Sequence, residues 1–153
     1  MMEWQSKECA PWHYILFCYS YDALGRLLKV TDPLAGVTEA CYDGSGNVKS
    51  ITDANGGTTG YTYDNNGNVL TVTDKQGTIS RTYDALNCVT EYTDYKGNTV
   101  KYGYDELGNL ISLTYPGGEI VRYTYYKNGL LHTATDAKGN TRVVVTLEIV
   151  DLR

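Results

Sequence analysis

The sequence has few of the residues on which metal or nucleic-acid binding usually depends. It contains two His and four Cys in 153 residues, and no two cysteines form a Cys-x-x-Cys pair, so we expect no zinc site. Acidic residues outnumber basic ones by 18 to 13, and the net charge is −5. A nucleic acid or an anionic membrane surface would need a basic face, so neither is an expected partner.

Long apolar runs are also missing. No run approaches the roughly 18 residues that a membrane-spanning helix needs. The apolar stretch at residues 13–19 is short, and the residues before it include Glu3, Lys7 and Glu8, which is not the basic start of a signal peptide. The sequence therefore predicts no membrane span and no signal peptide in this chain.

The few cysteines do not decide the redox compartment. Cys41 and Cys88 fall at different points of the repeat described below, as incidental substitutions would. We expect all four thiols to be free, and a Cys9–Cys18 disulfide is the alternative.

Tyrosine and glycine, in contrast, are abundant. The chain has 15 Tyr against one Phe and two Trp, together with 16 Gly. Tyr, Thr and Val favour strands, whereas Gly, Asp and Asn favour turns. A chain of this length is expected to form one domain. The composition therefore predicts a single all-β domain.

A period of 20 or 21 residues occurs six times. Each copy has a tyrosine before its first break, and these tyrosines follow one another at spacings of 21, 21, 20, 21 and 21 residues. A second break keeps the same rhythm, from Asp32 to Asp136. Internal periods of this length are typical of stacked repeat architectures. The six tyrosines are Tyr21, Tyr42, Tyr63, Tyr83, Tyr104 and Tyr125.

Two columns of glycine mark two turns in each copy. Four residues after the tyrosine stands Gly, or Asn87 in one copy, and both residue types adopt positive φ easily. Asp follows five of the six tyrosines and can accept hydrogen bonds from backbone N–H groups two residues on. The column after the second break has Ala35 as its exception. The first column contains Gly25, Gly46, Gly67, Gly108 and Gly129, and the second contains Gly56, Gly77, Gly97, Gly118 and Gly139.

Two short strands lie between the turns. The strand that enters the tyrosine alternates, as in Val100, Tyr102 and Tyr104, which indicates one buried face. The other strand begins with Leu or Val, and its fourth residue is apolar in every copy. Regular alternation would place these two positions on opposite faces. Its fifth residue is Thr in all six copies, so we expect the threonines to stack in a hydroxyl ladder.

The sequence thus predicts an all-β fold of about twelve short antiparallel strands in meander order. Each copy is one hairpin, and the hairpins stack side by side because an isolated hairpin is marginal. Residues 17–142 hold the six copies in a curved sheet or part of a β-shell. Residues 1–16 and 143–153 are caps, or places where a longer array was cut. The two sheet edges invite further repeats or self-association.

The tyrosines allow two interpretations. Buried, each ring would contribute about 1.5–3 kcal/mol by area, with its hydroxyl bonded at the rim of the sheet. Exposed, the rings would offer a flat row on which sugars could stack. Alternation with polar residues favours burial. Tyr95, Tyr115 and Tyr126 depart from the pattern and lie at turns, so they are the candidate ligand-facing rings.

No catalytic residue, metal site or cofactor is predicted. The same Asp recurs at turn after turn, whereas catalysis needs one constellation of groups with separated pKa values. Counting from Asp64, places six and twelve of a calcium loop hold Val69 and Lys75 instead of Gly and Glu. Weak calcium sites on the surface are the alternative. His13 and His132 have no partner that the sequence identifies, and we expect His132 on a strand surface.

Three segments carry a family resemblance. "YSYDALGRLL" (19–28), "KYGYDELGNL" (101–110) and "RYTYYKNGLL" (122–131) resemble the Rhs or YD-repeat consensus of an aromatic residue, any residue, Tyr-Asp, two residues, Gly, Arg or Asn, and Leu. The family includes bacterial Rhs and wall-associated proteins, C components of insecticidal toxin complexes, and teneurins. The resemblance implies a long β-ribbon that spirals into a hollow shell, which in bacterial members encloses a toxic domain.

The function that the resemblance implies is structural. We expect a non-enzymatic segment of a YD-repeat shell from a secreted or surface protein. The implied partners are further YD repeats, an enclosed toxin domain and glycans, since YD repeats have been linked to carbohydrate binding. A carbohydrate-binding surface module is the alternative function. The "DPLAG" of 32–36 is similar to a segment that ends bacterial arrays, but its position predicts an ordinary turn.

Overall fold

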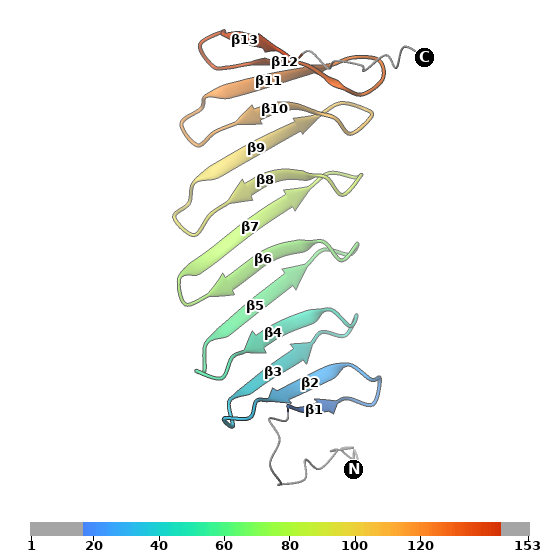
Figure 1. Cartoon of the computed structure of the whole chain (residues 1–153), viewed down its shortest axis with the longest axis vertical. Helices are drawn as coiled ribbons and strands as arrows, with labels where there is room; N and C mark the ends of the chain where they lie inside the picture. Colours follow the sequence, from blue (N-terminus) through green and yellow to red (C-terminus); the bar gives the residue numbers. More distant parts are fainter. Residues whose placement is uncertain (1–16, 145–153) are drawn as a thin grey trace, which may run out of the picture. The chain divides into compact units, whose positions relative to one another are not determined.

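A computed structural model describes residues 17–144 of the protein as thirteen β-strands, which pair antiparallel in sequence order (Figure 1). Those residues contain no helix, so the predicted all-β meander is confirmed, with one strand more than the twelve expected. Residues 1–16, and the predicted C-terminal segment beyond residue 144, lie outside the described residues. The strands are β1 (Cys18–Tyr21), β2 (Leu27–Thr31), β3 (Val37–Tyr42), β4 (Val48–Thr52), β5 (Thr58–Tyr63), β6 (Val69–Asp74), β7 (Gly77–Tyr83), β8 (Val89–Thr93), β9 (Thr99–Tyr104), β10 (Leu110–Thr114), β11 (Ile120–Tyr125), β12 (Leu131–Thr135) and β13 (Thr141–Val143).

The chain divides into two units between Ile79 and Ser80. The first contains β1 to β6 and the start of β7, and the second contains the rest of β7 and β8 to β13. Within each unit the same hairpin recurs with the same register. The repeat can therefore be followed in either unit alone.

Eleven of the twelve turns between the described strands are closed in the same way. In one of them, the N–H of Asp43 donates to the carbonyl of Asn47 at 2.9 Å, and the N–H of Gly46 donates to the carbonyl of Asp43 at 3.1 Å. This is a type I turn followed by a residue at positive φ. Gly46 has a φ of 92°, and the two non-glycine residues of the columns, Ala35 and Asn87, have φ of 65° and 64°.

The twelfth turn explains the one spacing of 20 residues. β6 continues to Asp74 and β7 begins at Gly77, so two residues connect them. The equivalent connection between β4 and β5 has five residues, 53–57. The connection is shorter by three residues, but β6 and β7 are each one residue longer than β4 and β5. The copy is therefore one residue shorter, which gives the spacing of 20 residues between Tyr63 and Tyr83.

A β-bulge next to every first turn corrects the expectation for the second strand of each copy. Cys41 pairs with Ser50 and Tyr42 with Val48, so Lys49 is an extra residue with no paired residue on β3. The same irregularity occurs in all six copies. Because the bulge adds one residue, Val48 and Ile51 lie on the same face, not on opposite faces. The six bulge residues are Leu28, Lys49, Leu70, Thr90, Ile111 and His132.

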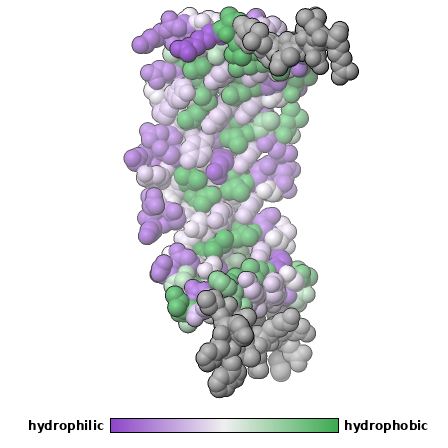
Figure 2. Space-filling view, viewed as in Figure 1, coloured by the Kyte–Doolittle hydropathy of each residue, from purple (hydrophilic) through white to green (hydrophobic). Residues whose placement is uncertain are grey.

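The two faces of the sheet differ in character. Directly paired residues share a face, and on one face Leu113 lies between Tyr102 and Val121. The opposite face has cross-strand ion pairs, with Lys29 Nζ 3.2 Å from the Glu39 carboxylate. The first unit has an apolar face of its own, where Ala40 pairs with Ile51 and Tyr61 with Val72. Figure 2 shows hydrophobic side chains in the middle of the strands and hydrophilic ones toward the turns.

Threonines on the polar face form pairs, which replaces the expected continuous ladder. The Oγ1 atoms of Thr52 and Thr58 are 3.1 Å apart across one hairpin, and those of Thr62 and Thr71 are 2.6 Å apart across the next. In each such pair, the two hydroxyls lie on adjacent strands and bond to each other, so identical positions of successive copies are not bonded to one another. The other pairs are Thr73–Thr78, Thr82–Thr90, Thr93–Thr99, Thr124–Thr133 and Thr135–Thr141.

No side chain of residues 17–144 is fully buried. The predicted burial of the tyrosines is therefore only partly reached: the repeat rings Tyr42, Tyr63, Tyr83, Tyr104 and Tyr125 are half-buried, and Tyr21 is 48% exposed. The reason is that no second layer covers the apolar face within this part of the chain. Neighbouring side chains on the same face remove part of each ring from water, and nothing removes the rest.

Candidate functional site at the Tyr-Asp turns

Within each unit, the repeat tyrosine connects its hairpin to the one before it. The hydroxyl of Tyr42, at the end of β3, donates to the carbonyl oxygen of Leu27, at the start of β2, at 2.8 Å. Within residues 17–144, this bond to a carbonyl 15 residues earlier is recorded for four tyrosines, at 2.8 or 2.9 Å. The partner is thus a backbone oxygen of the previous copy. The four bonds are Tyr42 to Leu27, Tyr63 to Val48, Tyr104 to Val89 and Tyr125 to Leu110.

Two of these phenols, Tyr63 and Tyr104, are held in the neutral form by a raised pKa. Partial burial is the main cause that raises the pKa of Tyr63, and the nearby Tyr61 and Asp43 add to it. Burial also raises the pKa of Tyr104. A neutral phenol keeps its proton and donates a hydrogen bond to the carbonyl oxygen, so the group serves as a connector and not as a base.

The aspartate after the tyrosine organises the turn. Oδ1 of Asp64 accepts hydrogen bonds from the N–H groups of Asn66 and Asn68, at 2.9 and 2.8 Å. Its Oδ2 accepts one from the side-chain amide of Asn68 at 2.9 Å. The predicted bond to the N–H two residues on is confirmed here. Both carboxylate oxygens are therefore engaged within the turn itself.

Hydrogen bonds of this kind lower the pKa of six turn carboxylates and keep them ionised. The Asn68 side-chain amide is the main cause that lowers the pKa of Asp64. At Asp43 the main cause of the lowered pKa is the backbone N–H of Asn47. The pKa is also lowered at Asp22, Asp94, Asp105 and Asp136. A carboxylate with a lowered pKa is a poor proton donor near neutral pH.

The sequence did not predict the role of one residue of the turn. The residue four places after the Asp returns its side chain to the carboxylate, as Asn47 does to Asp43 at 3.2 Å. In the first copy Arg26 takes this place, with Nε 2.6 Å from Asp22 and its guanidinium carbon 4.5 Å from the centre of the Tyr42 ring. The signal was present as Asp-x-x-Gly-Asn. It recurs at 43–47, 64–68, 94–98, 105–109 and 136–140.

Two neighbouring turns of the first unit enclose a polar pocket of about 410 Å³. Asp43, Ser45 and Asn47 line it from one turn, and Tyr63 and residues 64–67 line it from the next. Both carboxylates are already bonded within their turns. The pocket therefore offers amide and hydroxyl groups to a polar ligand, without a group prepared for catalysis.

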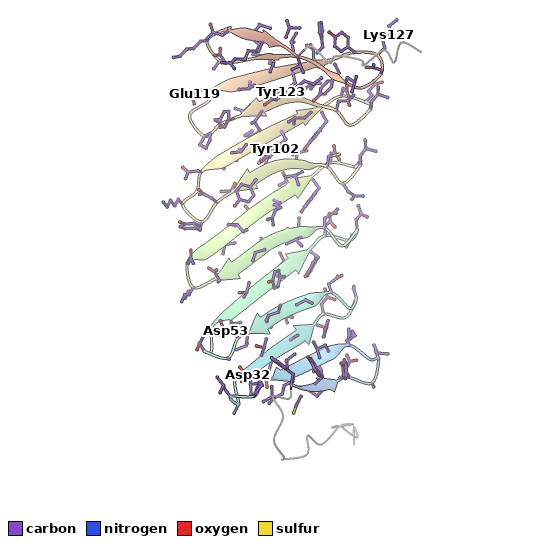
Figure 3. All side chains as sticks on the ribbon, in the orientation of Figure 1. Asp32, Asp53, Tyr102, Glu119, Tyr123 and Lys127 are labelled. Atoms are coloured by element: carbon purple, nitrogen blue, oxygen red, sulfur yellow. The ribbon has the colours of Figure 1, made fainter. Side chains whose placement is uncertain are left out.

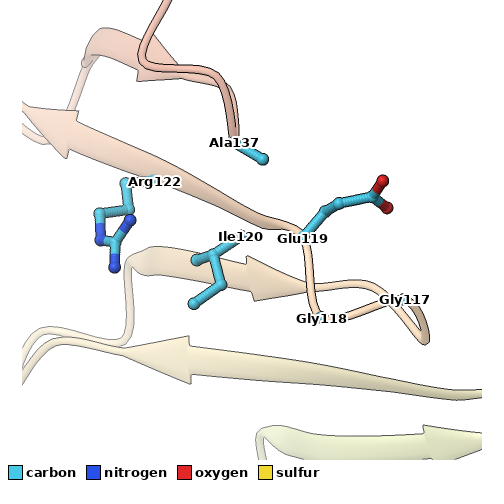
Figure 4. A pocket seen from close by; sticks show the side chains of 6 residues that line it. All are labelled: Gly117, Gly118, Glu119, Ile120, Arg122 and Ala137. Carbon is cyan, nitrogen blue, oxygen red and sulfur yellow. The ribbon is translucent and has the colours of Figure 1, made fainter.

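A second pocket lies in the second unit beside the turn before β11. Figure 4 shows Glu119 and Arg122 on either side of Ile120, with Gly117 and Gly118 in the turn below and Ala137 opposite. Its volume is also about 410 Å³. The ion pairs recorded within residues 17–144 do not include Glu119 or Arg122, and these groups do not converge on one point.

The three candidate ligand-facing rings are exposed, at 50% for Tyr95, 42% for Tyr115 and 43% for Tyr126. Lys96 holds its ammonium 5.6 Å from the centre of the Tyr95 ring, and His132 lies 4.3 Å from Tyr126, centre to centre. The three rings stand at separate turns (115–119 and 126–130 among them). Figure 3 likewise shows Asp32 and Asp53 at successive turns of the first unit, apart from one another.

The remaining candidates correct one expectation. Cys18 is disulfide-bonded, so the prediction of four free thiols is wrong for that residue; Cys41 and Cys88 are free, and Cys9 lies outside the described residues, as does His13. His132 is a bulge residue of β12. Within the described residues, no three His, Cys, Asp or Glu side chains could hold a metal ion together.

The hairpin with its Tyr-Asp turn is the unit that matches a known family. The RHS Repeat family matches residues 42–79 and 83–120. This chain belongs to the Rhs, or YD-repeat, family. The matched segments contain the second to the fifth Tyr-Asp turns, which begin at Tyr42, Tyr63, Tyr83 and Tyr104. The RHS repeat here is thus a hairpin with a type I turn and a bulge, joined by its tyrosine to the preceding copy.

Solved toxin-complex structures have the same fold. The crystal structure of TcdB2-TccC3 matches with a TM-score of 0.62 and 20% identity, over 78% of this chain and 7% of that one. The Photorhabdus luminescens Tc holotoxin pore matches with a TM-score of 0.53 and 16% identity, over 82% and 9%. This chain thus spans less than a tenth of either solved chain. No curated protein matches the sequence.

The RHS repeats make this chain a structural repeat module. Its repeated polar groups are used within the turns, as the bonds of Asp43 and Asp64 show. Within residues 17–144, no helix is long and apolar enough to span a bilayer.

Proposed function

We propose that this chain is a wall segment of a YD-repeat shell and has no enzymatic activity of its own. The observation that supports this most is the hydrogen bond from Tyr42 to Leu27 and its counterparts. In each of these four pairs of copies, the later copy supplies the donor and the earlier copy the acceptor. Such a connection can extend an array without limit, as a wall requires.

The lack of convergence supports the non-enzymatic part. The turn aspartates recur singly at successive turns, and their oxygens accept hydrogen bonds from their own turns. A catalytic constellation would instead bring a nucleophile or base together with a partner of different pKa. The wall would leave any chemistry to a domain that it encloses, such as a toxin domain, and would act in a secreted or surface protein.

The test is an assay of the purified chain against esters, glycosides, phosphate esters and peptides. We expect rates equal to those of buffer. Turnover that disappears in Asp64→Asn or Tyr63→Phe would overturn the proposal.

For localisation, protease added to intact cells that express the natural protein should remove the repeats, and full protection would contradict surface exposure.

Carbohydrate binding is a second candidate, supported by one exposed ring. Tyr115 is 42% exposed at a turn, and an exposed aromatic ring can stack on the apolar face of a sugar. Glycans on an array should bind the natural chain and lose binding in Tyr115→Ala, with Leu34→Ala, also at an exposed turn, as the control. Signals at background level for the natural chain would exclude this function.

A further inference from the structure

The fourth copy differs from the others at one cross-strand pair of the apolar face. Arg81 of β7 pairs with Tyr92 of β8, whereas the equivalent pairs join a tyrosine or an alanine to an aliphatic residue. In this copy the aromatic ring is on the second strand, and a cation stands where the other copies have a ring or a methyl group. The equivalent pairs are Tyr19 with Val30, Ala40 with Ile51, Tyr61 with Val72, Tyr102 with Leu113 and Tyr123 with Ala134.

Arg81 lies among apolar and aromatic side chains. Tyr83 follows it on the same strand and face, and Val100 pairs with Tyr92 on the next strand. All four side chains are half-buried. The guanidinium carbon of Arg81 is 5.5 Å from the centre of the Tyr92 ring. This cation–π contact holds the charge at the sheet surface but supplies no counter-charge.

No ion pair is recorded for Arg81 within residues 17–144. The lysines of the polar face differ, because Lys29 Nζ lies 3.2 Å from the Glu39 carboxylate and Lys101 Nζ 2.7 Å from that of Glu91. Partial burial removes water from the guanidinium of Arg81, and a carboxylate beside it would offset that loss of solvation. The polar face meets this requirement from its own residues, and the apolar face does not.

The charges of the second unit are divided unequally between its two faces. Among its strand residues, the apolar face carries Arg81 and Arg142. The one acidic strand residue of this unit, Glu91, pairs with Lys101 on the polar face. A chain with a net charge of −5 therefore has a positive apolar face in this unit, which is complementary to an acidic partner.

We propose that Arg81 and Tyr92 form a docking position for an acidic segment of a partner polypeptide. The segment places a carboxylate on the guanidinium and apolar side chains on the surrounding rings. Arginine suits this role because its planar N–H donors match the two oxygens of a carboxylate. A guanidinium that rests on an aromatic ring can still donate from its in-plane N–H groups.

The surroundings of Arg81 favour a peptide carboxylate over a phosphate-rich partner. Tyr83, Tyr92 and Val100 offer apolar surface to a partner's side chains, and excluding water strengthens the ion pair. A nucleic acid would need several cations close together, but five strands separate β7 from β13, which carries Arg142. The inference rests on the proposed wall role, in which this face contacts a segment that the wall holds.

The test is an NMR titration of the purified chain with two probe peptides, acetyl-Leu-Ser-Glu-Ser-Leu-amide and its Gln analogue. An extended peptide places its first, third and fifth side chains on one face, so the Glu lies between two leucines. We expect the Glu peptide to bind about fivefold more tightly than the Gln peptide. The side-chain Nε–Hε signal of Arg81, assigned by its loss in Arg81→Gln, should shift with the same affinity.

Three variants test whether the preference depends on Arg81. Arg81→Gln should make the two peptides bind alike, and Arg81→Lys should restore part of the preference because the charge returns. Arg122→Gln is the matched control, since Arg122 is exposed on the polar face of the same unit and no ion pair is recorded for it within residues 17–144. It should keep the full preference. Circular dichroism checks that each variant folds.

Three outcomes would overturn the inference: no binding of either peptide, equal binding of both to the natural chain, or a preference that survives Arg81→Gln. The first two need no variant, so a variant that fails to fold does not remove the test. A chain without the preference and without enzymatic turnover would refute the docking position and leave the proposed wall role intact. Enzymatic turnover together with an Arg81-dependent preference would do the opposite.

Discussion

Tyr63 and Val48 are 15 residues apart in the sequence, and a hydrogen bond of 2.8 Å joins the hydroxyl of the first to the carbonyl oxygen of the second. The bond crosses from the end of β5 to the start of β4. In the same turn region, the backbone of Tyr63 pairs with Val69 on the opposite side. One residue thus connects the hairpin behind it with the hairpin it begins.

Removing that hydroxyl should destabilise the array. Tyr63→Phe leaves the Val48 carbonyl without its donor, and we expect the free energy of unfolding to fall by about 1 kcal/mol. Urea denaturation measures the change. Tyr61→Phe is the matched control, because Tyr61 lies on the same strand and face and donates no hydrogen bond recorded within residues 17–144. Equal losses in the two variants would show that the hydroxyl bond does not contribute.

Acid should weaken the turns. A carboxyl whose pKa is lowered on folding binds its proton less readily in the folded state than in the unfolded one, so it stabilises the fold above the ordinary value of 3.8. The stabilisation is lost as the pH falls through the lowered folded pKa. Six turn aspartates share this shift. We expect the urea midpoint to decrease steeply below about pH 4.

The variant Asp64→Asn tests one of these groups. It retains an oxygen acceptor but cannot ionise, so its stability should depend less steeply on pH than that of the natural chain. The comparison needs urea curves for both proteins from pH 7 down to pH 2. An unchanged pH dependence would mean that the Asp64 turn does not couple to folding.

Ala35 is a site for stabilisation. It stands in a glycine column with a φ of 65°, a conformation that costs an L-residue roughly 1–2 kcal/mol. Ala35→Gly removes this strain. Glycine also raises the conformational entropy of the unfolded chain, which offsets part of the gain, so we expect a net stabilisation of about 0.5–1 kcal/mol. Thermal or urea unfolding measures it.

Ala40→Gly is the control for that substitution, because Ala40 is an ordinary strand residue of β3. There the same change should destabilise the protein by about 0.5–1 kcal/mol. A loss of stability at both positions would argue that the turn at Ala35 is not under strain.

The bulge can be tested by deleting its extra residue. Without Lys49, regular alternation would move Val48 to the polar face or force the turn out of register. We expect a loss of more than about 1 kcal/mol, in the range of changes that disrupt side-chain packing. Lys49→Ala keeps the bulge and should alter stability by less than about 0.5 kcal/mol. If deletion were as mild as Lys49→Ala, the bulge would not set the facing of Val48.

The sequence carried enough information to predict the turns and not enough to predict the faces. Asp64 and Gly67 could be assigned because a turn depends on φ and on hydrogen bonds within five residues. The position of Val48 could not, because a bulge is a matter of pairing between strands and has no composition of its own. The bulge column does hold the mixed set from Leu28 to His132, and that variability was its one local sign.

By itself the sequence determined the period, the strand order and the Tyr-Asp turns, since each depends on residues close together in the chain. The tertiary structure decided which oxygen each tyrosine hydroxyl reaches, because the acceptor of Tyr63 belongs to another copy. It also decided how deeply the rings are buried. Alternation predicts which side chains share a face, but burial requires a covering layer, and no pattern within a strand encodes that layer.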